Sequence, residues 1–286
     1  MPVEIENVSY VYAKGTPYEA KALNRICLKI EDGTFTGVMG HTGCGKSTLI
    51  QLIAGLLEPS EGRIFLDGKD INLRGYDRKE LRKKVGVIFQ YPEYQLFETT
   101  VERDVMFGAK RLGLSRAETE ERVRWALEKV GFDYERMRRL SPLGLSGGER
   151  KRIAMAGVLA VKPEILIMDE PIAGLDPLGR EALLKLTDEL NAEGTTIIMV
   201  SHDADVLAEH AGRVIVMENG EIAMDGAAKE ILSSVKKLEE KRLGISQAAE
   251  TAKLLRERGI DIGQDITRYD ELVFRLVSYL KGGAQK

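Results

Sequence analysis

The chain has 286 residues, of which 43% are apolar and 30% are charged, and its formal net charge is −3. This balance is typical of a folded globular protein and differs from that of a disordered or membrane-spanning chain. No stretch approaches the ~18 apolar residues of a membrane-spanning helix, and the N-terminus lacks the basic and apolar segments of a signal peptide, so we expect a cytosolic protein. The interspersed acidic and basic residues argue against a nucleic-acid partner.

Two kinds of strand are expected in the first part of the chain and in its centre. Alternating apolar residues over 3–8 and 26–30 predict antiparallel strands with one exposed face. Shorter and almost wholly apolar runs predict parallel strands that are buried on both faces. These runs are Phe35–Met39, Val85–Phe89, Ile165–Met168 and Thr196–Val200. The pattern predicts an α/β fold with an antiparallel β flank.

A helical stretch interrupts this core at about residues 94–160. Ser115 and Glu118 have the spacing of a capping box, and Gly131 is placed to end the helix that follows. We therefore expect an inserted helical subdomain here.

The core is expected to close with a hairpin, because Asn219-Gly220 lies between two apolar runs. From residue 226 onward the pattern changes to charged amphipathic helices, with a second capping box predicted at Thr267 and Asp270. The expected organisation is a core of residues 1–225 and a helical extension of residues 226–286.

The strongest chemical motif is a glycine-rich loop between a buried strand and an apolar helix. It consists of Gly40, His41, Thr42, Gly43, Cys44, Gly45, Lys46, Ser47 and Thr48. Such a loop turns backbone N–H groups toward a phosphate, with Lys46 reaching the β/γ oxygens and the Ser47 hydroxyl binding Mg²⁺. We expect His41 and Cys44 to contribute only backbone groups. The alternative is a chance glycine-rich turn.

Polar side chains follow three of the buried strands, where α/β sheets bind ligands. Asp169 is suited to hold Mg²⁺ and Glu170 to polarise an attacking water. Gln90 could reach the metal or that water, and His202 could bond the γ-phosphate or orient Glu170. The alternatives are a solvated strand end and a structural histidine.

A second glycine-rich segment consists of Leu145, Ser146, Gly147, Gly148 and Glu149. Ser146 can cap the helix that follows, and the glycine N–H groups then lie at its positive end. Two phosphate-binding segments in one chain suggest two chains facing each other.

The segment LSGGE at 145–149 resembles the signature motif of ABC ATPases. The resemblance implies a P-loop NTPase fold of the ABC type, with ATP and Mg²⁺ as cofactors and with the signature of one subunit closing over ATP on another. It also implies that Gln90 is the Q-loop residue, that Asp169 and Glu170 are the Walker B pair, and that His202 is the switch histidine. Asp176 then belongs to the D-loop, and the catalytic residues are Glu170, His202, Gln90 and Lys46.

By the same resemblance, Tyr12 matches the aromatic residue that stacks on adenine, although packing beside Tyr10 would also explain it. Ile172 departs from the family, in which many members carry threonine after the proline. We expect this change to alter packing near the D-loop and to leave the chemistry intact.

The segment of residues 89–97 resembles the corresponding part of energy-coupling-factor (ECF) and cobalt-transport ATPases. The resemblance implies an importer subunit on the cytoplasmic face of the membrane, which pairs through its C-terminal helices with a second ATPase, preferably a paralogue. A membrane T component would lie in a groove near Tyr91, Glu93, Gln95 and Phe97, and a membrane S component would bind the cargo. Packing of Leu96 and Phe97 inside the helical subdomain is the alternative, and a vitamin and a metal ion remain equally open as cargo.

Overall fold

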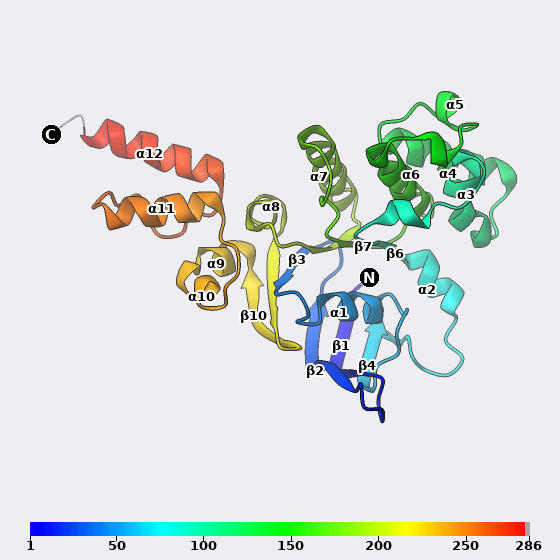
Figure 1. Ribbon diagram of the computed structural model, residues 1–286, viewed down its shortest axis with the longest axis horizontal. Coiled ribbons are helices and arrows are strands. Elements are labelled where there is room, and N and C mark those ends of the chain that lie inside the picture. The colour runs from blue at the N-terminus through cyan, green and yellow to red at the C-terminus, as the bar shows by residue number, and fades with distance from the viewer. Residues whose placement is uncertain (284–286) are drawn as a thin grey trace.

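The computed structural model describes residues 1–283, which form two sheets surrounded by helices (Figure 1). The larger sheet has the strand order β10-β9-β3-β8-β7-β6, and its strands β3, β6, β7, β8 and β9 are parallel. The smaller sheet has the order β2-β1-β4-β5 and is antiparallel. The predicted α/β core with an antiparallel flank is therefore confirmed.

The four strands predicted from buried apolar runs begin and end within one residue of the predicted positions. The larger sheet consists of β3 (Phe35–Gly40), β6 (Val85–Ile88), β7 (Ile165–Asp169), β8 (Thr196–Val200), β9 (Arg213–Glu218) and β10 (Glu221–Ala227). The flank consists of β1 (Val3–Tyr12), β2 (Ala20–Ile30), β4 (Glu61–Leu66) and β5 (Lys69–Asp70). Asn219 and Gly220 both have a positive φ between β9 and β10, which confirms the predicted hairpin turn.

Helices cover the core, and several of them lie within residues 94–160, the predicted insertion. They are α1 (Lys46–Ile53), α2 (Arg78–Lys84), η1 (Pro92–Gln95), α3 (Val101–Ala109), η2 (Lys110–Leu112), α4 (Arg116–Lys129), α5 (Tyr134–Met137), η3 (Pro142–Gly144), α6 (Gly147–Leu159), α7 (Pro177–Ala192) and α8 (Ala204–His210). The Ser115–Glu118 capping box is present at the start of α4, and Gly131 follows that helix with a φ of +81°. Within residues 1–283, no helix has both the length and the apolar character that crossing a membrane requires.

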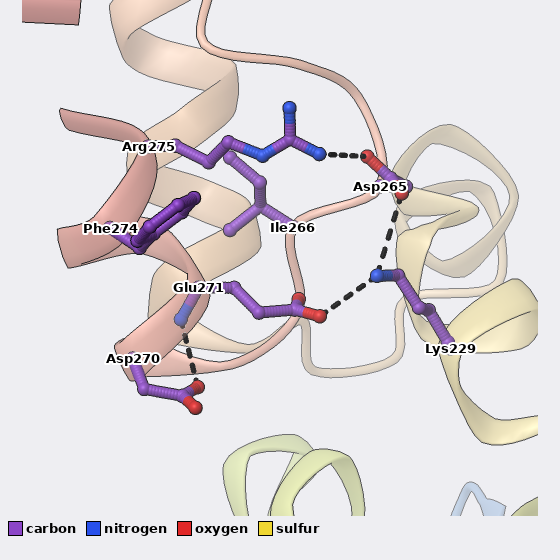
Figure 2. Close-up of a pocket in the computed structure, with 7 residues that line it drawn as sticks. All are labelled: Lys229, Asp265, Ile266, Asp270, Glu271, Phe274 and Arg275. Carbon is purple, nitrogen blue, oxygen red and sulfur yellow. Dashed lines mark hydrogen bonds and ion pairs between the residues drawn. The ribbon is translucent and has the colours of Figure 1, made fainter. Parts of the chain in front are cut away.

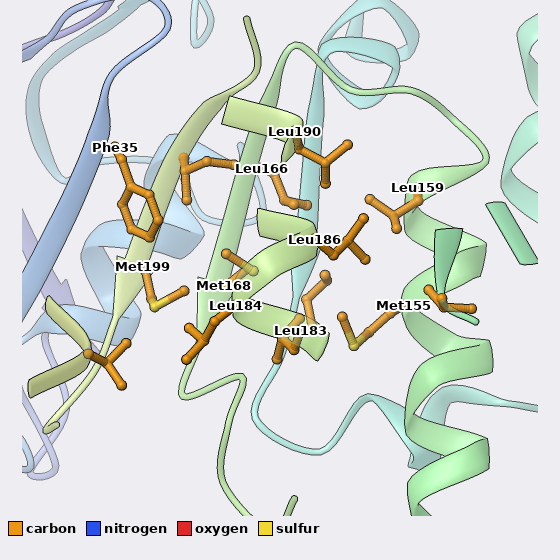
Figure 3. Packing of buried hydrophobic residues seen from close by; sticks show 14 of the residues in the cluster. Phe35, Met155, Leu159, Leu166, Met168, Leu183, Leu184, Leu186, Leu190 and Met199 are labelled. Atoms are coloured by element: carbon orange, nitrogen blue, oxygen red, sulfur yellow. The ribbon is translucent and has the colours of Figure 1, made fainter. Parts of the chain in front are cut away.

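The hydrophobic core holds α7 against the larger sheet (Figure 3). Leu183, Leu186 and Leu190 of α7 pack with Leu166 and Met168 of β7, and all five side chains are at least nine-tenths buried. Their burial removes apolar surface from water at about 25 cal/mol per Å². This packing supports β7, whose end lies beside that of β8 because the two strands are paired in parallel.

The C-terminal helices are α9 (Ala228–Ser233), α10 (Val235–Glu240), α11 (Gln247–Glu257) and α12 (Tyr269–Gly283). The predicted extension divides into two parts by its packing. Ile231, Leu232 and Leu238 belong to the main core, whereas α11 and α12 share a small cluster of their own around Ala252 and Leu272. In Figure 1, α11 and α12 lie at the opposite end of the molecule from α3–α6.

Charged side chains fasten α12 to α9 around a cavity of about 540 Å³ (Figure 2). The ammonium of Lys229 lies 2.8 Å from Glu271 and 3.5 Å from Asp265, and Arg275 lies 3.9 Å from Asp265. These residues neutralise one another, so the cavity is a structural junction.

The capping box predicted at Thr267 and Asp270 is wrong. The backbone N–H of Thr267 donates instead to Glu271 (3.3 Å), and Asp270 accepts from the backbone N–H of Glu271 (2.8 Å). Two adjacent carboxylates compete for the same helix start, and the one that also pairs with Lys229 takes the reciprocal bond.

Candidate functional site

A cleft of about 530 Å³ opens where β3, β6, β7 and β8 end. Most of the predicted nucleotide residues line it, namely Tyr12, Thr42, Gly43, Gly45, Lys46, Ser47, Thr48, Gln90, Asp169, Glu170 and His202. Sequence reasoning missed Ala20, Lys21 and Ala22, which line it from the start of β2. Nothing in their local pattern distinguishes them from other strand residues.

The glycine-rich loop is held in a conformation that only glycine adopts without strain. Gly40 has a φ of +150°, and a β-carbon there would lie 2.4 Å from the carbonyl oxygen of Met217. Gly45 has a φ of +104° and would meet the carbonyl of Ala22 at 2.7 Å. The loop is therefore packed against β9 and β2, and its backbone is fixed before a ligand arrives.

Lys46 is buried within this loop, at 7% exposure. Its ammonium donates to the carbonyls of Gly40 (2.5 Å) and His41 (2.8 Å). The positive charge thus lies at the base of the loop, where an anion would be attracted to it.

The His41 side chain has a contact that the sequence did not predict. Its Nε2 makes a close polar contact with the carbonyl oxygen of Lys241, at the end of α10. Lys241 in turn pairs with Glu218 of β9. The glycine-rich loop is therefore in direct contact with the C-terminal extension.

Ser47 and Asp169 bring two oxygen ligands together. The Ser47 hydroxyl donates to Oδ2 of Asp169 at 3.0 Å, across 122 residues of chain. Burial raises the pKa of Asp169, and the Ser47 bond and Lys46 oppose that shift. A hydroxyl and a carboxylate beside a phosphate-binding loop fit the oxygen preference of Mg²⁺, which protein sites hold through few side chains plus substrate phosphates.

Glu170 directly follows β7 and lies in a strained backbone conformation, with a φ of +48°. Burial, reinforced by the Asp169 carboxylate, raises the pKa of Glu170 to about 7. Its Oε1 lies 3.4 Å from Nε2 of His202 but has no hydrogen-bond partner within residues 1–283. A buried carboxylate that titrates near neutrality is suited to act as a general base.

His202 follows β8, the strand next to β7, and borders the same cleft. Burial and the charge of Lys46 lower the pKa of His202, so the imidazole is neutral at pH 7. A neutral imidazole can donate one hydrogen bond and accept another.

Tyr12 is 41% exposed, and its hydroxyl lies 3.1 Å from that of Thr48. Its ring meets Tyr10 edge to face, at 4.8 Å between centroids. Tyr12 therefore borders the cleft and also packs on Tyr10, and its stacking on adenine stays a prediction.

The LSGGE segment lies outside this cleft. Ser146 caps α6 through a capping box, accepting from the N–H of Glu149 (3.3 Å), while Glu149 accepts from the N–H of Ser146 (2.8 Å). A β-carbon on Gly147 or Gly148 would meet nothing within 4 Å. The fold of this chain therefore leaves open space at both glycines.

Asp176 also lies outside the residues that line the cleft. Its side chain caps α7, accepting from the N–H of Gly179 at 2.8 Å. Part of its hydrogen-bonding capacity is thus used locally.

Comparisons with known proteins show the family to which the chain belongs. The ABC transporter family profile matches residues 23–173. A relative from Clostridium perfringens, named energy-coupling factor transporter ATP-binding protein EcfA2, is 48% identical over 267 residues, which cover 93% of this chain and 94% of the relative. A relative of the same name from Caldanaerobacter subterraneus subsp. tengcongensis is 45% identical over 283 residues, or 99% of each chain.

Two solved structures are similar in fold. CbiO1 from C. perfringens, described as part of the ABC transporter complex cbiONQ, has a TM-score of 0.71 and 39% identity, covering 83% of this chain and 93% of its own. The cassette MJ0796, solved as a dimer in a post-hydrolysis state with ADP and Pi, has a TM-score of 0.70 and 31% identity, covering 79% of this chain and 98% of its own. The chain therefore belongs to the ABC transporter ATPase family, in its group of energy-coupling-factor ATP-binding proteins.

Proposed function

We propose that this chain hydrolyses ATP within a dimer of ABC ATPases and couples the reaction to uptake of a vitamin or a metal ion through membrane partners. The observation that carries the proposal is the separation of the two glycine-rich segments. The loop at Lys46 lines the cleft, whereas Gly147 and Gly148 face open space elsewhere. Each segment supplies half of a phosphate site, and a second chain supplies the other half.

In the hydrolysis step, Glu170 polarises the attacking water and His202 orients it or contacts the γ-phosphate. Lys46 and the loop N–H groups stabilise negative charge on the phosphates. Ser47, Asp169 and Gln90 would hold Mg²⁺, which neutralises charge on the β- and γ-phosphates when it is bound. Tyr12 offers the adenine ring an aromatic face, a contact worth about 1–3 kcal/mol per base in other systems.

The dimer closes because the γ-phosphate of ATP binds the two glycine-rich segments, one from each chain, at the same time. It reopens when hydrolysis cleaves this phosphate from ADP. ATP thus shifts a population toward the closed state because only that state binds it fully. Membrane helices attached to the two ATPases would move with this cycle.

The C-terminal extension supplies a permanent dimer contact. Exposed apolar side chains recur along α12 at Tyr269, Val273, Val277 and Leu280, the spacing of one helix face. This stripe adjoins the buried Leu272 and extends the apolar surface of α12 beyond what α11 covers. We assign it to a second ATPase chain, preferably a paralogue, at the cytoplasmic face of the membrane.

The segment after β6 supplies the contact with the membrane T component. Tyr91 is 51% exposed and Phe97 is 63% exposed, although the Phe97 ring also packs on Phe107 at 4.8 Å. Leu96 packs into the main core, and Glu93 is half-buried against α6. Tyr91, Gln95 and Phe97 therefore form the accessible part of this contact, and the S component is reached only through the T component.

A photoreactive ATP analogue with an aryl azide on its γ-phosphate tests the shared site. In the native oligomer, we expect it to label the peptide that contains Ser146, and in the separated chain only peptides of the cleft. Cleft labelling alone in both states would contradict the dimer mechanism.

Membrane extraction separates the transport role from a non-transport ABC ATPase, because an importer subunit should co-purify with apolar partner chains.

A further inference from the structure

Lys151 is a buried lysine in the helix that follows the LSGGE segment. Its exposure is 3%, whereas its neighbours Arg150 and Arg152 are partly exposed. Its ammonium donates to the carbonyl oxygen of Ala173 at 2.7 Å. A lysine that gives up its hydration to make one backbone contact costs free energy, so the contact itself needs an explanation.

Ala173 belongs to the turn that carries the catalytic carboxylate. The N–H of Ala173 donates to the carbonyl of Glu170 at 3.2 Å, and the turn continues to Asp176 at the start of α7. The hydrogen bond from Lys151 therefore restrains the turn three residues after Glu170, where the backbone is already strained. Movement of this carbonyl would move the Glu170 side chain.

Lys151 also interacts electrostatically with the segment after Gln90. Burial lowers the pKa of Lys151, and the Glu93 carboxylate opposes that shift. Glu93 lies in η1, which packs against α6, and its Oε2 is buried without a hydrogen-bond partner within residues 1–283. Among residues 1–283 the two side chains form no ion pair within 4.0 Å, so Glu93 compensates the burial of Lys151 only in part.

We propose that Lys151 is a positioning residue for ATP hydrolysis, which holds the Glu170–Asp176 turn through the Ala173 carbonyl. Through Lys151, the position of that turn also depends on the Glu93 carboxylate. Lys151 touches neither the cleft nor the nucleotide-binding loop. The link runs from the surface after Gln90, through α6, to the catalytic carboxylate. The sensitivity to a membrane partner at that surface rests on the proposed function, whereas the restraint on the turn does not.

The first test compares Lys151→Met, Lys151→Arg and the control Arg152→Met in the full-length chain within its native oligomer. Lys151→Met should lower kcat by about 10- to 100-fold with an unchanged KM for ATP, because a misplaced catalytic group costs rate without costing binding. Lys151→Arg should retain most activity because it keeps the donor and the charge. Arg152 bonds Val130 and stacks on Phe132, away from the turn, so its variant should keep the wild-type kcat.

Thermal unfolding separates positioning from stabilisation. Lys151→Met removes the desolvation cost of a buried charge but leaves the Ala173 carbonyl without its donor, and because these effects oppose each other the Tm should change little. A lowered Tm that accounts for the lost activity would make Lys151 a stabilising residue and overturn the proposal, as would a wild-type kcat.

Hydrogen exchange provides a readout that does not require turnover. Backbone amides of residues 172–176 should exchange faster in Lys151→Met than in Arg152→Met, while the β7 amides stay protected. Equal exchange in the two variants would show that Lys151 does not restrain the turn.

A double-mutant cycle tests the link to Glu93. Glu93→Gln should change kcat several-fold in the wild-type background and much less in the Lys151→Met background, because coupled residues are non-additive. Multiplicative effects would remove the link. Vesicle uptake is measured in parallel, because impaired uptake by Tyr91 and Phe97 variants together with a multiplicative cycle would uphold the partner contact while rejecting the link between Glu93 and Lys151.

Discussion

The imidazole Nε2 of His202 lies 3.4 Å from Oε1 of Glu170, although 32 positions of the sequence separate the two residues. The contact exists because β7 and β8 are parallel neighbours, with Asp169 paired to Val200, so that the residues following each strand meet. Neither side chain is placed by its local sequence. Their approach gives a base and a hydrogen-bonding partner at one edge of the sheet.

Replacing Glu170 with Gln should slow ATP hydrolysis by the ~10²- to 10⁴-fold typical of a lost general base. ATP should still bind, because Gln keeps the shape of the side chain, and closed dimers should accumulate. Single-turnover hydrolysis and size-exclusion chromatography with ATP measure the two effects. Undiminished turnover would remove Glu170 from this role.

The pH dependence of hydrolysis should reflect the raised pKa of Glu170. Only the ionised carboxylate acts as a base, so kcat/KM should fall below an apparent pKa of about 7 and approach a plateau above it. Burial lowers the pKa of His202, which favours the neutral imidazole at and above pH 7. Residual activity of Glu170→Gln should lack this acid limb, and a wild-type limb near the ordinary glutamate value of 4.5 would contradict the assignment.

Replacing Gly40 or Gly147 with alanine should distinguish a glycine that the fold requires from one that the shared ATP site requires. Gly40→Ala puts a β-carbon 2.4 Å from the Met217 carbonyl at a φ of +150°, so it should cost about 1–3 kcal/mol of folding free energy. Gly147→Ala meets open space at the start of α6 and should keep or slightly raise stability.

Gly147→Ala should nevertheless reduce hydrolysis on the order of 10²-fold, because the new methyl group displaces the phosphate of the other chain. Chemical denaturation and ATPase assays on the same samples give both quantities. Normal activity of Gly147→Ala would show that no phosphate approaches this segment.

Charges on the exposed stripe of α12 should weaken the ATPase pair. Val273→Asp combined with Leu280→Asp removes apolar contacts worth about 1.5–3 kcal/mol per fully buried side chain, so the dissociation constant should rise about 10²-fold or more. Sedimentation without nucleotide measures the pairing. Ser278→Asp lies on the other side of the helix and serves as control; if it weakens pairing equally, the stripe is not the contact.

Truncating the exposed aromatic side chains after β6 should uncouple the importer. Tyr91→Ala with Phe97→Ala should reduce uptake in reconstituted vesicles, while ATP hydrolysis by the native ATPase pair changes less than twofold, because both rings are largely exposed. Unchanged uptake would place the membrane partner elsewhere.

The sequence by itself determined the features that depend on residues close together in the chain. The capping boxes at Ser115 and Ser146, the Asn219-Gly220 turn and the glycine-rich loop after β3 all arise from side chains reaching backbone within a few positions. The buried strands could also be predicted from the sequence, because a short, uninterrupted apolar run is typical of a strand that is covered on both faces. Local competition defeated even this kind of prediction at Thr267, where Glu271 displaced Asp270.

Only the tertiary structure decided which distant groups meet. His41 contacts Lys241, 200 residues further along the chain. In the sequence, Lys151 lies between Arg150 and Arg152, and nothing distinguishes it from these basic neighbours. Packing of α6 against η1 and the hydrogen bond to Ala173 bury that charge at 3% exposure, whereas the neighbouring Arg150 and Arg152 stay partly exposed. Burial and the neighbouring Asp169 charge raise the pKa of Glu170, and the hydrogen bond to Ala173 orients Lys151; both depend on how the elements pack together.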